Sequence, residues 1–182
     1  MTLTVGDKVV YPGRGPCLIG GIVQKIVCGM STRFWRLALL DDSGAELFVP
    51  IDNIRGVHTR PLLDRSQIPE LLGNLKPRAR VTTNRPTAKS WRERELNNAK
   101  LFGSGSIFDL AELVGSLTQL SGTKTLTPQE RESLYRARKL MICEIAEVMD
   151  ESKSAAEARI DTVLEPGKNK TGDRTEIEPL SV

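Results

Sequence analysis

The first third of the chain has the short apolar runs that are typical of β-strands. "DKVVY", "LIGGIVQKIV", "FWRLALL" and "ELFVPI" are rich in β-branched and aromatic residues, and the turn-forming stretches "PGRG", "CGMS" and "DDSG" separate them. Four or five short antiparallel strands predict a small curled barrel of the SH3 or Tudor type. Pro50 then stands at a strand end or on an edge strand, where its missing N–H is tolerated.

Beyond these runs the apolar period changes from two residues to about three and a half. A short apolar face over residues 68–75 predicts a helix, for which Ser66 is a candidate cap. The following stretch, "GNLKPRARVTTNRPTAK", has prolines and basic residues but no apolar period, which indicates a linker. We therefore expect a first domain over residues 1–75 and a basic linker over residues 76–89.

Helix-capping patterns mark the rest of the chain. "SWRE" has the S-x-x-E spacing in which Ser90 caps the first turn, so Trp91 should be the first residue of a helix. "TPQE", which starts at Thr127, is a second capping box with proline at the first helical position, and "SAAE" repeats the spacing from Ser154. Apolar stripes at helical spacing follow each of these starts.

These patterns define the expected organisation of the whole chain. The helical domain should cover residues 90–164, and residues 165–182 are polar and rich in helix breakers, which predicts a disordered tail. The fold class is then α+β in separate domains, with an N-terminal SH3- or Tudor-like β-barrel and a C-terminal all-helical domain.

Trp91 has no apolar face of its own helix to join. Its neighbours one turn later are Arg94 and Glu95, at the spacings where helical side chains share a face. The ring therefore either packs against another element or serves a function outside the core, and the residues by themselves leave both readings open.

The positive charge of the chain is concentrated around this tryptophan. The net charge of the 182 residues is +3, but residues 76–100 contain eight basic and two acidic side chains, whereas residues 144–182 contain five basic and ten acidic ones. A basic block of this kind favours an anionic partner such as nucleic acid, with a solvated basic linker as the alternative.

Candidate catalytic and metal-binding chemistry is sparse. The chain has one histidine, His58, without a nucleophile or carboxylate motif beside it. Cys17, Cys28 and Cys143 have no C-x-x-C spacing, which predicts reduced structural thiols and no zinc site. No apolar run approaches the length that spans a membrane, and the N-terminus lacks the pattern of a signal peptide. We expect a cytosolic protein that is not an enzyme and needs no metal or cofactor.

Two parts of the chain resemble one family of bacterial proteins. "VGDKVVYPGRGPCLIGGI", followed by a strand, a hairpin and "LFVP", resembles the RNA polymerase-interacting domain shared by CarD-type regulators and transcription-repair coupling factors. "SWRERELNNAKLFGSGSIFDLAELVGSL" and "LTPQERESLYRARKLMICEIAEVM" resemble the C-terminal domain of the CarD/CdnL family. Because a G-D-x-V opening also occurs in KOW-type ribosomal barrels, a KOW- or Tudor-like protein associated with ribosomes or RNA is the alternative.

The resemblance implies a non-enzymatic regulator of transcription initiation. Its barrel would bind the β subunit of bacterial RNA polymerase by adding a strand to a sheet edge. The protein would act as a monomer in the cytoplasm, with polymerase at the nucleoid. Phe48 departs from the family, because several members have arginine at this place. The residues that match the polymerase contact are Lys25, Val27, Leu47, Phe48 and Val49.

The resemblance also assigns a DNA contact to the helical domain. It carries the family's wedge tryptophan onto Trp91, which would insert in the minor groove at the upstream edge of the promoter bubble and stabilise the open complex. Leu96 stands where members often have lysine, so part of the phosphate contact is expected in the linker over residues 76–89. The basic residues implied to hold the wedge in place are Arg92, Arg94, Arg136, Arg138 and Lys139.

Overall fold

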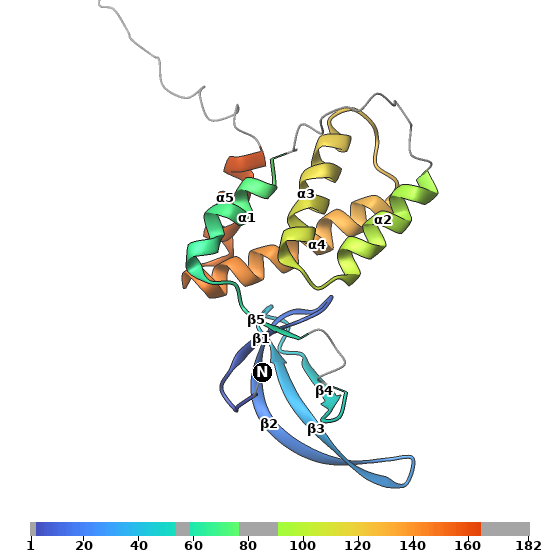
Figure 1. Ribbon diagram of the computed structural model, residues 1–182, viewed down its shortest axis with the longest axis vertical. Helices are drawn as coiled ribbons and strands as arrows, with labels where there is room; N and C mark the ends of the chain where they lie inside the picture. The colour runs from blue at the N-terminus through green and yellow to red at the C-terminus, as the bar shows by residue number, and fades with distance from the viewer. Residues whose placement is uncertain (1–2, 54–58, 77–90, 165–182) are drawn as a thin grey trace, which may run out of the picture.

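The chain folds into a β-sheet and a bundle of helices, each with its own apolar cluster. The computed structural model describes residues 3–53, 59–76 and 91–164, and only the backbone of residues 91–94. In Figure 1 the sheet lies below the helices. The predicted fold class, strands first and helices in a separate half, is thereby confirmed. The expected linker, apart from Lys76, and the expected tail lie outside the described residues.

The sheet is antiparallel throughout, with the strand order β4-β3-β2-β1-β5. Its strands are β1 (Lys8–Tyr11), β2 (Gly15–Val27), β3 (Met30–Leu39), β4 (Glu46–Pro50) and β5 (Arg60–Pro61). The edge strands β4 and β5 do not pair with each other in the described part of the chain, so the sheet is open where the strand pattern predicted a closed barrel. Closure requires two edges that match in length and register, and β5 has only two residues.

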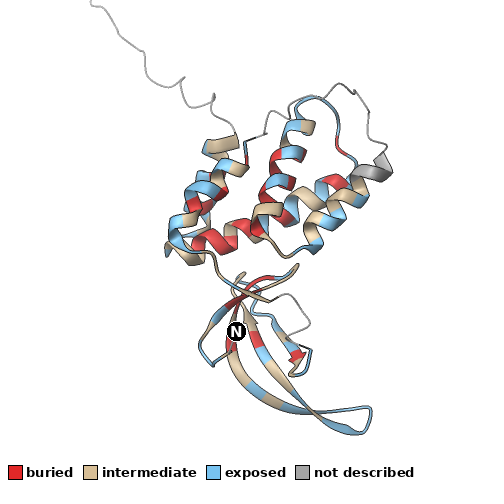
Figure 2. Cartoon of the chain, in the orientation of Figure 1, coloured by how far each residue is buried: buried red, intermediate tan, exposed pale blue. Residues whose placement is uncertain are grey.

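Alternation along the strands builds a small apolar core on one face of the sheet. Leu37 and Val49 are buried in it, and Trp35 packs against it. The long hairpin of β2 and β3 extends past this core, and at its tip Ile26 is 79% and Met30 69% exposed. Figure 2 shows this contrast between the buried base of the sheet and the exposed tip.

The helices begin close to where the capping patterns predict. The "TPQE" box is formed: Thr127 Oγ1 accepts a hydrogen bond from the Glu130 N–H at 3.2 Å, and Glu130 Oε2 accepts one from the Thr127 N–H at 2.9 Å. Ser106 caps the preceding helix by accepting from the Asp109 N–H. The helices are η1 (Arg65–Gln67), α1 (Ile68–Asn74), α2 (Trp91–Gly103), α3 (Ile107–Ser121), α4 (Pro128–Met149) and α5 (Lys153–Leu164).

Two of the predicted caps are wrong. Ser66 lies inside η1, because the N-cap is two residues earlier, at Asp64, whose N–H donates to Gln67 Oε1 at 3.1 Å. Ser154 lies inside α5, because Ser152 Oγ accepts from the Ala155 N–H at 3.2 Å and starts the helix sooner. In both segments several polar residues compete for the cap, and spacing alone does not decide between them.

Helix α1 belongs to the helical core, although the sequence predicted residues 1–75 as one domain. Its buried residues Ile68 and Leu71, with Leu75, join the apolar cluster of α3, α4 and α5. Gly115 of α3 permits the close approach, because a Cβ at this position would lie 2.4 Å from the Leu75 carbonyl oxygen. An apolar helix face shows that a surface is buried, but not which surface covers it.

The glycine at position 115 provides a test of this packing. Gly115→Ala should lower the free energy of unfolding by about 1–3 kcal/mol, because the new methyl group meets the α1 backbone rather than a flexible side chain. The matched control is Gly73→Ala, which has open space around its Cβ and should be neutral or stabilising by about 0.5–1 kcal/mol. Urea unfolding of both variants measures the difference, and equal stabilities would contradict the contact.

The three thiols differ in exposure. Burial raises the pKa of Cys17 to about 11 and also raises the pKa of Cys143, whereas Cys28 is exposed in the turn between β2 and β3. At pH 8 only about one in a thousand Cys17 thiols is then ionised. We expect one thiol to react rapidly with Ellman's reagent in the native protein and the other two only after denaturation. Rapid reaction of all three would contradict the burial.

Candidate functional site

The outer edge of β4 is open to an added strand. Hydrogen bonds from the Leu39 N–H to the Ala45 carbonyl (2.9 Å) and from the Ile51 N–H to the Arg33 carbonyl (3.2 Å) flank the β3–β4 ladder. Because bonded and non-bonded pairs alternate in an antiparallel ladder, Phe48 occupies a non-bonded position. Its N–H and carbonyl therefore point away from β3, towards an edge that no described strand occupies.

The side chain of Phe48 lies on the sheet face opposite the core. It is 38% exposed, and the Lys25 ammonium nitrogen lies 3.1 Å from the centroid of its ring, a cation–π contact. Val27 is 45% exposed near the tip of the same hairpin. Phe48 and Val27 are thus exposed, and Lys25 lies beside Phe48; their contact with polymerase stays a prediction.

The other two predicted contact residues face the interior. Val49 is only 5% exposed, and Leu47 packs against the core of the sheet. Both occupy bonded positions of the ladder, so their N–H and carbonyl groups bind β3. They support the edge strand, Val49 from the buried core and Leu47 from a partly buried position. The sequence "ELFVP" indicated that successive side chains alternate between the two faces of the sheet, but it did not indicate which set faces the core.

Helix α2 begins at Trp91, which confirms the predicted helix start. Ser90, the predicted cap, and the side chains of Trp91, Arg92 and Arg94 lie outside the described residues. In Figure 1 the helix begins on the side of the bundle away from the sheet and ends close to the sheet. Leu96, one turn further along, is 60% exposed.

Arg136 borders a groove between α2 and the first turns of α4. Its guanidinium carbon lies 4.8 Å from the ring centroid of Phe102, so the exposed guanidinium stacks on the face of the ring. The groove has a volume of about 590 Å³, and Asn98, Pro128 and Ser133 are among the residues that line it. Neither the groove nor the stack could be inferred from the sequence, because Phe102 and Arg136 belong to different helices.

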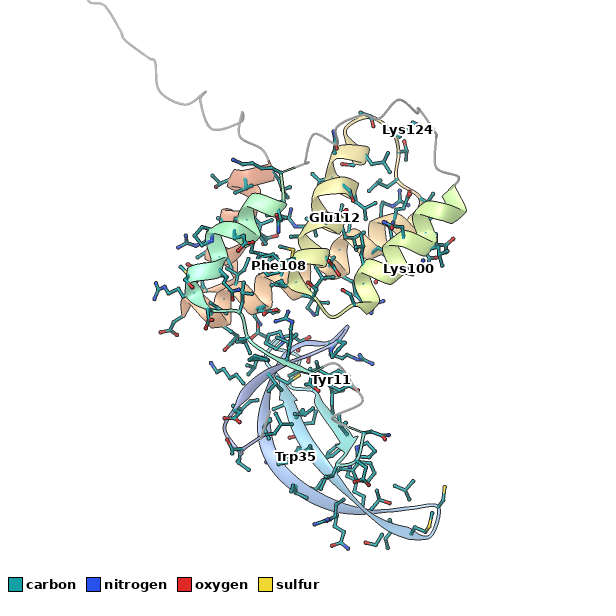
Figure 3. All side chains as sticks on the ribbon, in the orientation of Figure 1. Tyr11, Trp35, Lys100, Phe108, Glu112 and Lys124 are labelled. Carbon is teal, nitrogen blue, oxygen red and sulfur yellow. The ribbon has the colours of Figure 1, made fainter. Side chains whose placement is uncertain are left out.

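The other two basic residues predicted on α4 are engaged in ion pairs. Arg138 Nη2 lies 2.6 Å from Asp161 and 3.3 Å from Glu157, both on α5. Lys139 Nζ lies 3.3 Å from Asp41, whose hydrogen bond raises the pKa of this lysine. A phosphate group would have to compete with these carboxylates. Exposed Lys100 on α2 and Lys124 on the α3–α4 loop, labelled in Figure 3, lie on the same half of the molecule as Arg136.

The described residues contain no group of three or more histidine, cysteine or acidic side chains that could hold a metal ion. No helix in the described ranges is long and apolar enough to cross a membrane. His58, the only histidine, lies outside the described residues. The surfaces that remain as candidate sites are the β4 edge with its Lys25–Phe48 stack and the region around the start of α2.

Comparison with known proteins matches both halves of the chain to one family. Residues 3–60 match the model of the CarD-like/TRCF RID domain, and residues 80–161 match the model of the CarD C-terminal domain. The chain also matches the solution NMR structure of the 72-residue N-terminal domain of Myxococcus xanthus CarD, with 35% sequence identity and a TM-score of 0.28. The match covers 33% of this chain and 79% of the CarD domain.

The two family models together span most of the chain in the order strands and then helices, which agrees with the fold described above. Such a pair of domains marks an RNA polymerase-interacting transcription regulator, from a family of non-enzymatic proteins, and it favours this reading over a ribosomal one. This protein belongs to the CarD/CdnL family of bacterial transcription regulators.

Proposed function

We propose that this protein binds the β subunit of bacterial RNA polymerase through the β4 edge and stabilises the promoter open complex through Trp91. It acts in the cytoplasm, with polymerase at the nucleoid. The observation that carries the proposal is the open outer edge of β4, with Phe48 and Lys25 beside it, in a domain of the polymerase-interacting type.

The polymerase contact is a strand added to β4. The outward N–H and carbonyl of Phe48 supply a matched donor and acceptor, while the stacked Lys25 and Phe48 offer an apolar surface with a positive charge beside it. Pro50 ends the strand without an N–H, which limits how far a second strand can pair along the edge. The added strand is therefore short and centred near Phe48.

The DNA contact is made by the start of α2. An aromatic ring that stacks on the last base step at a melted fork gains roughly 1–3 kcal/mol per base. Unstacking a step costs a few kcal/mol, but polymerase has already melted the bubble, so the wedge bears little of this cost. Trp91 therefore hinders re-annealing more than it binds duplex DNA.

Phosphate contacts hold the wedge in place without reading sequence. Among the described basic residues Arg136 suits this role well, because its charge is exposed and its guanidinium stacks on the ring of Phe102. Arg92 and Arg94, in the first turn of α2, also bind phosphate in this proposal. Arg138 and Lys139 contribute less, since each is paired with a carboxylate. Tethering to polymerase raises the local concentration, so a weak DNA affinity suffices.

The wedge is tested by truncating its ring. Trp91→Ala should shorten the lifetime of the open complex on a purified promoter by roughly 5- to 150-fold, which corresponds to ~1–3 kcal/mol of stacking. Trp91→Phe keeps a ring and should restore part of the effect, and Leu96→Ala removes an exposed apolar side chain of the same helix as a control. If the open complex has the same lifetime with the wild-type protein and with a folded Trp91→Ala variant, the mechanism is excluded.

The β4 edge is tested by comparing two substitutions at Phe48. Phe48→Ala removes the ring but keeps the outward N–H, whereas Phe48→Pro removes both without breaking a bond to β3. If the backbone docks, Phe48→Pro should bind the purified β subunit roughly fivefold more weakly than Phe48→Ala, the worth of about one hydrogen bond. Circular dichroism checks that both fold, and equal affinities would argue against an added strand.

A further inference from the structure

Arg60 is the residue at which the sheet, helix α4 and the turn between α2 and α3 meet. From β5, its Nη1 and Nη2 donate to Oε1 and Oε2 of Glu144 on α4, at 2.6 and 2.8 Å. Its Nε donates to the carbonyl of Gly105, which lies between α2 and α3, at 2.8 Å. A guanidinium holds its donors in one rigid plane. These bonds therefore restrict how β5, α4 and the turn between α2 and α3 are oriented relative to one another.

The pair joins a partly buried arginine, 25% exposed, to a buried glutamate. The side chain of Glu144 is 3% exposed, and its Oε1 also accepts a hydrogen bond from the Leu63 N–H at 3.2 Å. A buried carboxylate that loses its partner is strongly destabilised, so the contact resists opening. By contrast, the Lys8 side chain in the neighbouring pair with Glu147 is 49% exposed, where water and salt weaken the attraction.

Close packing beside this pair seats α2 and α4 on the sheet. A Cβ at Gly15 of β2 would lie 3.0 Å from Leu140 Cδ2 of α4, and a Cβ at Gly13 would lie 3.7 Å from Phe102 of α2. The end of α2 is therefore held against the sheet, while its first residue, Trp91, lies a helix length away. At 1.5 Å per residue this is about 18 Å, so a tilt of about 10° at the base moves the start of α2 by about 3 Å.

The order of the strands gives this geometry a functional consequence. Arg60 is on β5 and the proposed polymerase contact is on β4, which are opposite edges of one sheet. The sheet, the Arg60–Glu144 pair and α2 then form a continuous rigid connection from the polymerase contact to Trp91. If the connection between the sheet and α2 were flexible, Trp91 of a polymerase-bound protein would sample a wide range of positions. The effective concentration of Trp91 at the fork would then be lower.

We propose that Arg60, with Glu144 and Gly105, positions α2 relative to the polymerase-binding edge, so that the two contacts act on one open complex at the same time. Arg60 is a positioning residue here, because it acts through its bonds to Glu144 and Gly105 and lies on the sheet edge opposite β4. The inference rests on the proposed function, because the joint effect of both contacts is what the positioning serves.

The test replaces the pair without leaving a buried charge. In the double variant Arg60→Met with Glu144→Gln, the glutamine keeps an oxygen acceptor for the Leu63 N–H. The matched control is Arg159→Met with Glu151→Gln. That pair also joins an arginine to both oxygens of a glutamate, at 2.8 and 3.0 Å, but it lies wholly within the helical half.

Three readouts separate positioning from simple stability. The first is affinity for the purified β subunit, which should not change. The second is the open-complex lifetime, which should fall about fivefold or more, the lower end of typical coupling between sites. The third is the distance distribution between spin labels on the exposed Cys28 and on Lys124→Cys, which should broaden. The control variant should leave all three unchanged.

The outcomes distinguish this inference from the proposed function. An unchanged distance distribution or an unchanged lifetime in the folded double variant would overturn the positioning role. If Trp91→Ala shortens the lifetime and the double variant does not, the positioning role alone fails; if neither does, the proposed function fails as well. Should the double variant melt at the assay temperature, Arg60→Lys keeps the charge, loses the planar fork and is measured in the same three ways.

Discussion

The ion pair between Arg60 and the buried Glu144 is the constraint from which we infer how the two halves are held relative to each other. The sheet has a small apolar core and a two-residue strand at one edge, and α4 packs against β2 beside the pair. The pair adds a fixed orientation to this packing, because a bidentate contact tolerates very few geometries. Around it, the more exposed pairs of Lys8 with Glu147 and of Lys139 with Asp41 add contacts that salt can screen.

Helix α4 serves both halves because its two faces carry different side chains. Ala137, Met141 and Ile145 recur at a spacing of four and enter the helical core. Leu140 and Glu144, also four apart, face the sheet. This division places α4 against β2 and, through Arg60, against β5, while β4 forms the opposite edge of the sheet. The same division decides which basic residues are available, since Lys139 lies on the side that meets the turn after β3.

Local patterns were reliable where the interactions are local. The "TPQE" box predicted the start of α4 because its hydrogen bonds join residues three apart. The position of Pro50 at the end of an edge strand followed from the strand pattern in the same way. Ser66 and Ser154 were less reliable, because neighbouring polar residues compete for one cap and the exact turn depends on how the chain arrives. The start of α2 at Trp91 agrees with its pattern, while the wedge role remains a proposal.

The amino-acid sequence by itself determined the two-part fold, the family and the placement of Trp91 at the head of a helix, because periodicity, capping and motif are properties of neighbouring residues. Tertiary structure alone decided the rest. It placed α1 in the helical core, left the sheet open, turned Leu47 and Val49 inward, and paired Arg138 and Lys139 with distant carboxylates. These outcomes depend on contacts between residues far apart in the chain, and a one-dimensional pattern states that a group is buried or charged without naming its partner.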